Sequence, residues 1–260
     1  MSRATRERLA RLLEEDDPDA AEANLLVAAE ADPGLDAGAV LARIDAIALR
    51  ARERGVVPAL RDEGLRGDRE EYDDPRNSFL HCVLERRRGL PIALATLTLA
   101  VARRVGVPMA GIGLPGHFVV ADLAGGAPEY LDAFDDWRRM SAAECARAVA
   151  RTAGMALRPE HLEPVGVRAI TARTLANLRG AYLRRRRLAD ALWTAELAEV
   201  VTPGAPGVAA DRVSLLTAVG RYAEAEEAAV AYLAGRVPPR ERAGMRARLA
   251  AARELRRRMS

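Results

Sequence analysis

The segment RRRGLPIALATLTLAVARRVG, residues 86–106, decides how this chain is interpreted. Between residues 92 and 105 its side chains are apolar on almost every face of a helix, which indicates a buried central helix. Pro91 suits the first turn of that helix, where a missing backbone N–H costs little. Gly106 is expected to end the helix, and Gly89 is expected to end the preceding helix in the left-handed conformation.

Helices are also predicted before this segment. Apolar residues recur at helical spacing over residues 4–15, 18–30 and 37–53. The polar stretch over residues 54–78 is interrupted by proline and glycine, so we expect a loop or short turns there. A further helical pattern starts at Phe79 and leads to the central helix.

After the central helix the pattern changes to short apolar runs separated by turn residues. PMAGIGL, HFVVAD and EYLDAF predict antiparallel strands over residues 108–114, 117–122 and 129–134. Ser141 and Glu144 form the pattern of a capping box, which predicts another helix to about Ala150. Helices followed by a small antiparallel sheet indicate an α+β domain.

The chain is predicted to be helical from residue 166 onward, and this last third contains a repeat. Advancing by 34 residues takes Arg186 to Gly220, Leu188 to Tyr222 and Ala191 to Ala225. That period is typical of tetratricopeptide repeats, in which each unit is a pair of helices.

Composition and charge restrict the function. The chain of 260 residues is 50% hydrophobic and 30% charged, which is typical of a globular protein. Residues 165–260 carry 18 arginines against 9 acidic residues, and such a basic surface is suited to an acidic binding partner. No aromatic residues interleave the basic run at 183–187, so we do not expect nucleic-acid binding.

The cysteines and the hydropathy suggest no special environment. Cys82 and Cys145 form no CxxC pair, and we expect no disulfide framework, no metal site and no cofactor. The chain has neither a secretory leader pattern nor an apolar segment long enough to span a membrane. We therefore expect a cytoplasmic protein that does not contact membranes.

One constellation suggests chemistry. His117 is expected at the start of one strand, and Asp132 lies 15 residues later in the next. Neighbouring antiparallel strands can place a carboxylate beside an imidazole and orient it. A cysteine at the N-terminus of the packed helix would complete a Cys-His-Asp triad, because the helix dipole favours the thiolate.

The order of these elements resembles the transglutaminase-like core of the papain-like superfamily. NSFL, RRGLPI, GVP and PGHF together resemble more closely its bacterial branch with C-terminal tetratricopeptide repeats, the Salmonella invasion regulator B type, over roughly residues 20–240. The resemblance implies an N-terminal helical segment (1–60) packed on a transglutaminase-like core (61–158), followed by a tetratricopeptide-like helical tail (166–260).

The resemblance also indicates where a nucleophile belongs. Active transglutaminase-like cores open the helix with glycine, one residue and then cysteine, with alanine four residues further on. When Gly89 and Ala95 are matched to that pattern, the cysteine position falls on Pro91, which has no nucleophilic atom. The resemblance therefore implies a degenerate site in which His117 and Asp132 match and the nucleophile does not.

Other residues are candidates for the same pocket. Cys82 lies on the preceding predicted helix, where we expect a buried structural thiol, and its neighbour His81 is expected to project in another direction. Asn77 and Ser78 are expected to cap that helix. Because they belong to the NSFL motif, a role in the pocket beside Pro91 is their alternative.

Three functions stay open. The favoured hypothesis is a non-catalytic scaffold that binds a protein or peptide segment in the degenerate cleft. The second is an enzyme: a cysteine-type hydrolase or acyltransferase that uses Cys82, or a hydrolase whose water is activated by His117 and Asp132. The third is a regulator that binds nucleic acid through the basic last third.

Overall fold

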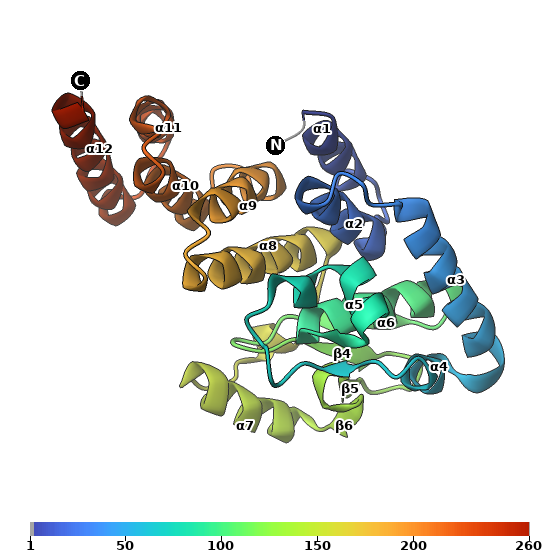
Figure 1. Cartoon of the computed structure of the whole chain (residues 1–260). Coiled ribbons are helices and arrows are strands. Elements are labelled where there is room, and N and C mark those ends of the chain that lie inside the picture. The colour runs from blue at the N-terminus through green and yellow to red at the C-terminus, as the bar shows by residue number, and fades with distance from the viewer. Residues whose placement is uncertain (1–2, 260) are drawn as a thin grey trace. The chain divides into compact units, whose positions relative to one another are not determined.

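The computed structural model describes residues 3–259, which divide into two compact units (Figure 1). Residues 3–174 form the core unit and residues 175–259 form the tail unit. The division falls inside helix α8 (Val167–Arg184), whereas the sequence placed the start of the tail at residue 166. No helix in the described part of the chain is long and apolar enough to cross a membrane.

The central helix of the core unit is α6 (Pro91–Val105), as predicted. Eleven of its residues are buried, and Pro91 lies in its first turn. The buried hydroxyls of Thr96 and Thr98 donate hydrogen bonds to carbonyl oxygens four residues earlier, so these polar groups are satisfied within the helix. Gly106 ends the helix at φ 73°, as expected.

The N-terminal helices are largely those predicted: α1 (Arg3–Leu12), α2 (Ala20–Ala31) and α3 (Ala37–Arg54). The expectation of a loop or short turns over residues 54–78 was partly wrong, because helix α4 (Val56–Asp62) lies there. Pro58 is in the first turn of α4, where proline is tolerated. The buried side chains of Val56 and Leu60 hold α4 on the core.

Helix α5 (Leu80–Arg86) ends earlier than predicted. Arg87, not Gly89, takes the left-handed conformation, at φ 60°. Gly89 belongs instead to β2 (Arg88–Gly89), which pairs in parallel with β1 (Arg66–Gly67). A Cβ at Gly89 would lie 2.9 Å from a methyl group of Val83, so glycine is needed here for close packing.

The sheet of the core unit has five antiparallel strands in the order β6-β5-β4-β3-β7. The three predicted strands are present as β3 (Met109–Ile112), β4 (Val119–Asp122) and β5 (Glu129–Asp132). The two edge strands, β6 (Arg138–Met140) and β7 (Pro164–Val165), were missed. Strands of two or three residues are too short to show an alternating pattern.

Both faces of this sheet are covered. Val120 and Leu131 pack in the same cluster as α6. Val119 and Tyr130 face the other way and pack with α7 (Ala142–Ala153), which Figure 1 shows on the opposite side of the sheet from α6. The fold is therefore α+β, with a central helix on a small antiparallel sheet, as predicted. The predicted capping box of α7 is present at its N-terminus.

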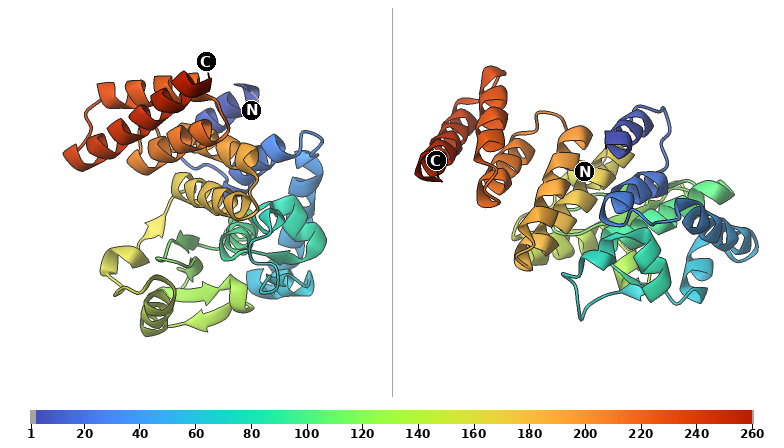
Figure 2. Two further views of the ribbon diagram at one scale, coloured as in Figure 1. Left: turned by 60° about the vertical axis from the view of Figure 1, so that its left-hand side comes forward. Right: turned by 45° about the horizontal axis from the view of Figure 1, so that its top comes forward.

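The tail unit is entirely helical. Besides the end of α8 it contains α9 (Leu188–Val201), α10 (Pro206–Ala218), α11 (Tyr222–Ala234) and α12 (Pro239–Met259). From α9 to α12 each helix packs against the next (Figure 2).

The 34-residue period of the sequence is also found in the hydrogen bonds, ion pairs and backbone angles of the tail. Arg187 and Arg221 each donate a backbone hydrogen bond of 2.9 Å to the carbonyl five residues earlier. Each also forms an ion pair with the acidic residue three positions later. Arg186 and Gly220 both have left-handed backbones, at φ 56° and 80°. The tail is consistent with a tetratricopeptide-like stack.

Candidate functional site

The turn before β4 places His117. Its backbone N–H donates to the carbonyl of Leu114, and Gly116 in the turn has φ 73°. A Cβ at Gly116 would lie 2.6 Å from the hydroxyl oxygen of Thr152 on α7, so only glycine fits. The imidazole is thereby held just before the N-terminal end of β4, the middle strand of the sheet, which begins two residues later.

Asp132, the last residue of β5, completes the predicted pair. Its Oδ2 lies 2.9 Å from Nε2 of His117, and its Oδ1 accepts a hydrogen bond of 3.1 Å from the N–H of Phe134. Burial by itself would raise the pKa of Asp132, but the hydrogen bond and charge of His117 and the backbone N–H of Phe134 lower it below its usual value. The carboxylate is therefore ionised and orients the ring.

The pair opens into a pocket of about 340 Å³. Pro91, His117 and Asp132 all line it, so the fold brings together the three positions that the family resemblance matched. Because the ionised Asp132 only accepts hydrogen bonds, Nε2 of His117 carries the proton between them. The other ring nitrogen, Nδ1, has no hydrogen-bond partner within residues 3–259.

Among the residues that the structure describes, neither a cysteine nor a serine lines the pocket. The hydroxyl of Thr152, which lines the pocket, is directed at the carbonyl oxygens of Pro115 and Ala148. Pro91, the position that the family resemblance assigns to the nucleophile, contributes an apolar ring to the lining. The described lining of the site therefore combines an oriented imidazole with no thiol.

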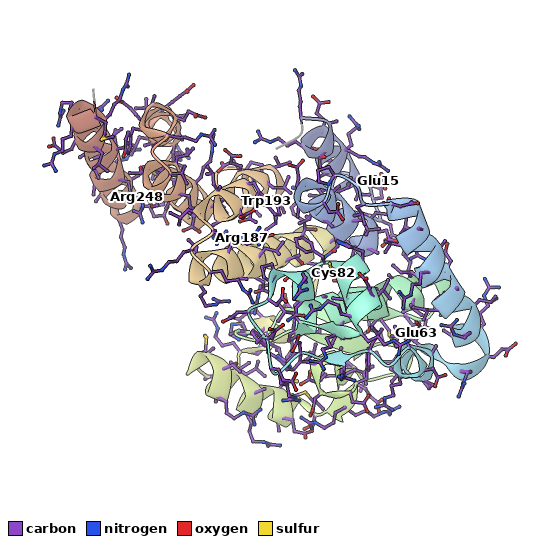
Figure 3. The ribbon with its side chains drawn as sticks, in the orientation of Figure 1. Glu15, Glu63, Cys82, Arg187, Trp193 and Arg248 are labelled. Atoms are coloured by element: carbon purple, nitrogen blue, oxygen red, sulfur yellow. The ribbon has the colours of Figure 1, made fainter. Side chains whose placement is uncertain are left out.

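Cys82 lies on α5 (Figure 3). It does not line this pocket. The expectation that His81 projects away from it was wrong, because Nε2 of His81 is 3.2 Å from the sulfur. Burial, with a smaller effect of Glu85, raises the pKa of the Cys82 thiol, and burial lowers the pKa of His81. At neutral pH this contact joins an uncharged thiol to an uncharged ring.

Cys145 does not line the pocket either. It is buried in the cluster between α7 and the far face of the sheet. Burial, together with the charges of Asp132 and Glu144, raises the pKa of its thiol to about 11. Neither cysteine is an activated nucleophile.

Asn77 joins three segments instead of lining the pocket. Its amide donates to the carbonyl of Glu71, its side-chain oxygen accepts from Arg86, and its backbone carbonyl accepts from Leu90 just before α6. It is fully buried, so these bonds fix the approach of α5 to α6.

The expected capping role of Asn77 and Ser78 was wrong. Both belong to the short helix η1 (Pro75–Ser78), and α5 has no side-chain cap from its own segment. Asn24 of α2 takes that role, donating to the carbonyl of Ser78 and accepting from the N–H of Leu80. The hydroxyl of Ser78 is buried without a partner in the described part of the chain.

Arg86 was not recognised in the sequence as a determinant of the site. Besides Asn77, its guanidinium contacts Asp68 at 3.4 Å and Asp74 at 3.5 Å, two carboxylates that are 1% and 3% exposed. These contacts clamp the loop of residues 68–77. The signal was an acidic run, DREEYDD, shortly before three consecutive arginines.

The clamped loop forms one wall of the pocket. Tyr72 packs edge-on against the ring of Phe134 at 5.7 Å, and the guanidinium of Arg69 lies 5.1 Å from the same ring. Phe134 follows Asp132 in the short helix η2 (Ala133–Asp135). The wall therefore joins two segments about 60 residues apart in sequence.

The turn after η2 is strained. Asp136 and Trp137 are consecutive non-glycine residues with left-handed backbones, at φ 52° and 50°. Trp137 is buried, and its indole N–H donates a 2.8 Å hydrogen bond to the hydroxyl of Thr98 on α6. This anchor holds a backbone conformation that is otherwise unfavourable, and it keeps η2 at the pocket.

No group of three or more histidine, cysteine, aspartate or glutamate side chains within residues 3–259 is arranged to hold a metal ion.

Comparison with known proteins identifies a family and several bacterial relatives. Residues 39–176 match the family described as "Transglutaminase-like superfamily". A "UPF0162 protein" of Xylella fastidiosa (strain 9a5c) is 33% identical over 175 residues, which is 65% of this chain and 62% of that protein. A "UPF0162 protein" of Vibrio cholerae is 36% identical over 151 residues, 57% of this chain and 56% of that protein.

The chain is also similar to part of an animal protein. "F-box only protein 21" of Mus musculus is 31% identical over 122 residues, 44% of this chain but only 19% of that protein. The chain thus spans less than two thirds of the length of the relatives it matches. No solved structure matches it.

Proposed function

Because this chain belongs to the transglutaminase-like superfamily, we propose that its pocket binds a protein or peptide segment without forming a covalent acyl intermediate. One observation carries the proposal: Pro91, His117 and Asp132 line one pocket, and Pro91 presents no sulfur, hydroxyl or amine to the imidazole. The hydrogen bond between His117 and Asp132 is intact, so the ring is held ready to contact a ligand.

The surroundings of the pocket support an extended ligand. A second hollow of about 330 Å³ adjoins the first, and the two share Arg69, Phe134 and Asp135 as lining residues. Aromatic faces and a few charged groups around a concave surface are typical of ligand sites. A peptide in extended conformation is a ligand long enough to occupy both hollows.

The tail unit supports a scaffold role independently. Its helices repeat with a 34-residue period, and stacked helix pairs of this kind form extended binding surfaces. We propose that the tail binds a second protein segment. A cytoplasmic location agrees with two cysteines that form no disulfide.

A hydrolase is the second candidate function, and one observation favours it. Nδ1 of His117 has no partner among the described residues, while Asp132 supports positive charge on the ring. Such a ring can take a proton from a water molecule that attacks a bound carbonyl.

The test uses the purified full chain. We expect it to bind members of an immobilised peptide array and to release no ammonia from glutamine peptides in the presence of an amine donor. His117→Ala should abolish peptide binding at the pocket. His161→Ala is the matched control, because His161 lies outside the pocket, bonded to Arg158.

Catalytic turnover by the wild-type chain that disappears in His117→Ala, but persists in His161→Ala, would establish an enzyme and end the scaffold proposal. Peptide hydrolysis without a trapped adduct would favour the water mechanism.

A further inference from the structure

The charged groups around the pocket are almost completely paired. Asp132 is engaged by His117. Asp135 lies between two cations, with Oδ1 2.8 Å from Arg69 and Oδ2 3.0 Å from Arg138. Arg138 also contacts Glu144 at 2.8 Å. Both lining aspartates are therefore hydrogen-bonded by side chains of the chain itself.

Arg151 is the exception among the charged lining residues that the structure describes. It projects from α7 and is exposed, with no ion pair or hydrogen bond to any residue within 3–259. Its neighbour Thr152 packs on the turn that holds His117, so Arg151 stands on the same wall as that turn. Arg151 thus presents an unpaired positive charge to the pocket.

The imidazole offers the complementary polar contact. Since Nε2–H of His117 is donated to Asp132, Nδ1 of the neutral ring is a hydrogen-bond acceptor without a partner in the described chain. A peptide N–H is a donor that suits it. The pocket therefore presents an acceptor and a separate cation, a combination that matches an amide N–H near a carboxylate.

We propose that the pocket selects peptides by a carboxylate group, which pairs with Arg151 while a nearby peptide N–H donates to Nδ1 of His117. The carboxylate comes from a free C-terminus or from an aspartate or glutamate side chain. Arginine recognises carboxylates through directional, charge-assisted hydrogen bonds. This inference rests on the proposed function, because it names the ligand class of the same pocket.

The experiment exploits the scarcity of histidine. The chain has only three, so NMR spectra of the full chain labelled with ¹⁵N-histidine contain few ring signals, and His117→Gln identifies the one of interest. The probes are N-acetyl-alanine, N-acetyl-glutamate α-amide and the uncharged N-acetyl-alaninamide. We expect the two acids to shift the His117 signal at concentrations about fivefold lower than the amide, an ordinary effect of one charge-assisted bond.

Arg151→Gln should remove that preference by raising the half-saturation of both acids to that of the amide. Arg147→Gln is the matched control, because Arg147 is an exposed arginine one turn earlier on α7 that does not line the pocket. It should leave the preference unchanged. A stronger response to N-acetyl-alanine identifies a C-terminus as the ligand, and a stronger response to the glutamate probe identifies a side chain.

Two results overturn the inference and are distinguishable. Carboxylate selection is ruled out if the acids and the amide shift the His117 signal at equal concentrations and Arg151→Gln changes nothing. It is also ruled out if Arg151→Gln and Arg147→Gln weaken acid binding equally. Both results leave the proposal of a peptide pocket standing. Absence of any His117 shift, together with a peptide array that shows no binding dependent on His117, removes the proposed function as well.

Discussion

Two histidines of the core unit contact a side chain of a catalytic type, and their environments differ. His117 lies 2.9 Å from an ionised carboxylate and opens into a pocket, but no thiol lines that pocket. His81 lies 3.2 Å from the Cys82 thiol, but burial keeps both groups uncharged and neither lines the pocket.

The comparison shows that residue types in contact are not sufficient for catalysis. A thiolate nucleophile requires a cationic or dipolar environment that lowers its pKa, and Cys82 has the reverse. The imidazole at His117 has the orienting carboxylate that His81 lacks. Each place therefore contains part of a triad, and the fold keeps the parts separate.

The largest expected effect comes from placing a thiol at the pocket. In Pro91→Cys we expect the new thiol to react with iodoacetamide at pH 7 at least about tenfold faster than Cys82, because the start of a buried helix and the nearby imidazole favour a thiolate. Mass spectrometry of the labelled peptides measures both rates in one sample.

Adding His117→Ala to that variant should reduce the new thiol's rate towards that of Cys82, and Pro91→Ala reports the stability cost of losing proline alone. Equal rates at the two thiols in Pro91→Cys would mean that position 91 does not face the imidazole productively, and the comparison would lose its basis.

The next effect concerns the carboxylate. Asp132→Ala should lower the free energy of unfolding by about 2 kcal/mol at pH 7, because it removes the bonds to His117 and to the N–H of Phe134 inside the fold. Urea denaturation measures it. The control is Asp122→Ala, at the last residue of β4. It should lower the free energy of unfolding by less than about 1 kcal/mol.

Acid should erase that difference. The pKa of Asp132 is lowered in the folded protein, so its carboxylate stabilises the fold fully above the unfolded value, about 3.9, and this contribution is lost as the pH falls through the lowered folded value. The gap between wild type and Asp132→Ala should therefore narrow below about pH 4. A gap of constant size down to pH 2 would contradict an ionised pair.

The smallest effect is expected at Cys82, the thiol beside the other histidine, His81. Cys82→Ala should change the free energy of unfolding by less than about 1 kcal/mol, since the side chain is only half-buried, and peptide binding should not change. The labelling rate of wild-type Cys82 should still rise above pH 9, because its pKa is raised. Saturation of that rate near pH 7 would show an activated thiol instead.

Much of the fold was predictable because its signals are local. The apolar helix α6, the short apolar runs of strands β3 to β5, the Ser141–Glu144 capping box and the 34-residue period each depend on residues within a few turns or one repeat. The misses were elements whose conformation depends on distant contacts. Helix α4 is held by its buried face, and the edge strands β6 and β7 are formed by pairing with β5 and β3.

The site divides in the same way. From the sequence alone, the neighbouring strands predicted that His117 and Asp132 meet, and the family resemblance implied that Pro91 stands at the position of the nucleophile. Only the tertiary structure decided that Asn77, Ser78 and Cys82 lie outside the pocket and that Arg69 and Arg151 line it. Those positions result from packing between segments tens of residues apart, and the spacing of residues along the chain does not predict which distant segments pack together.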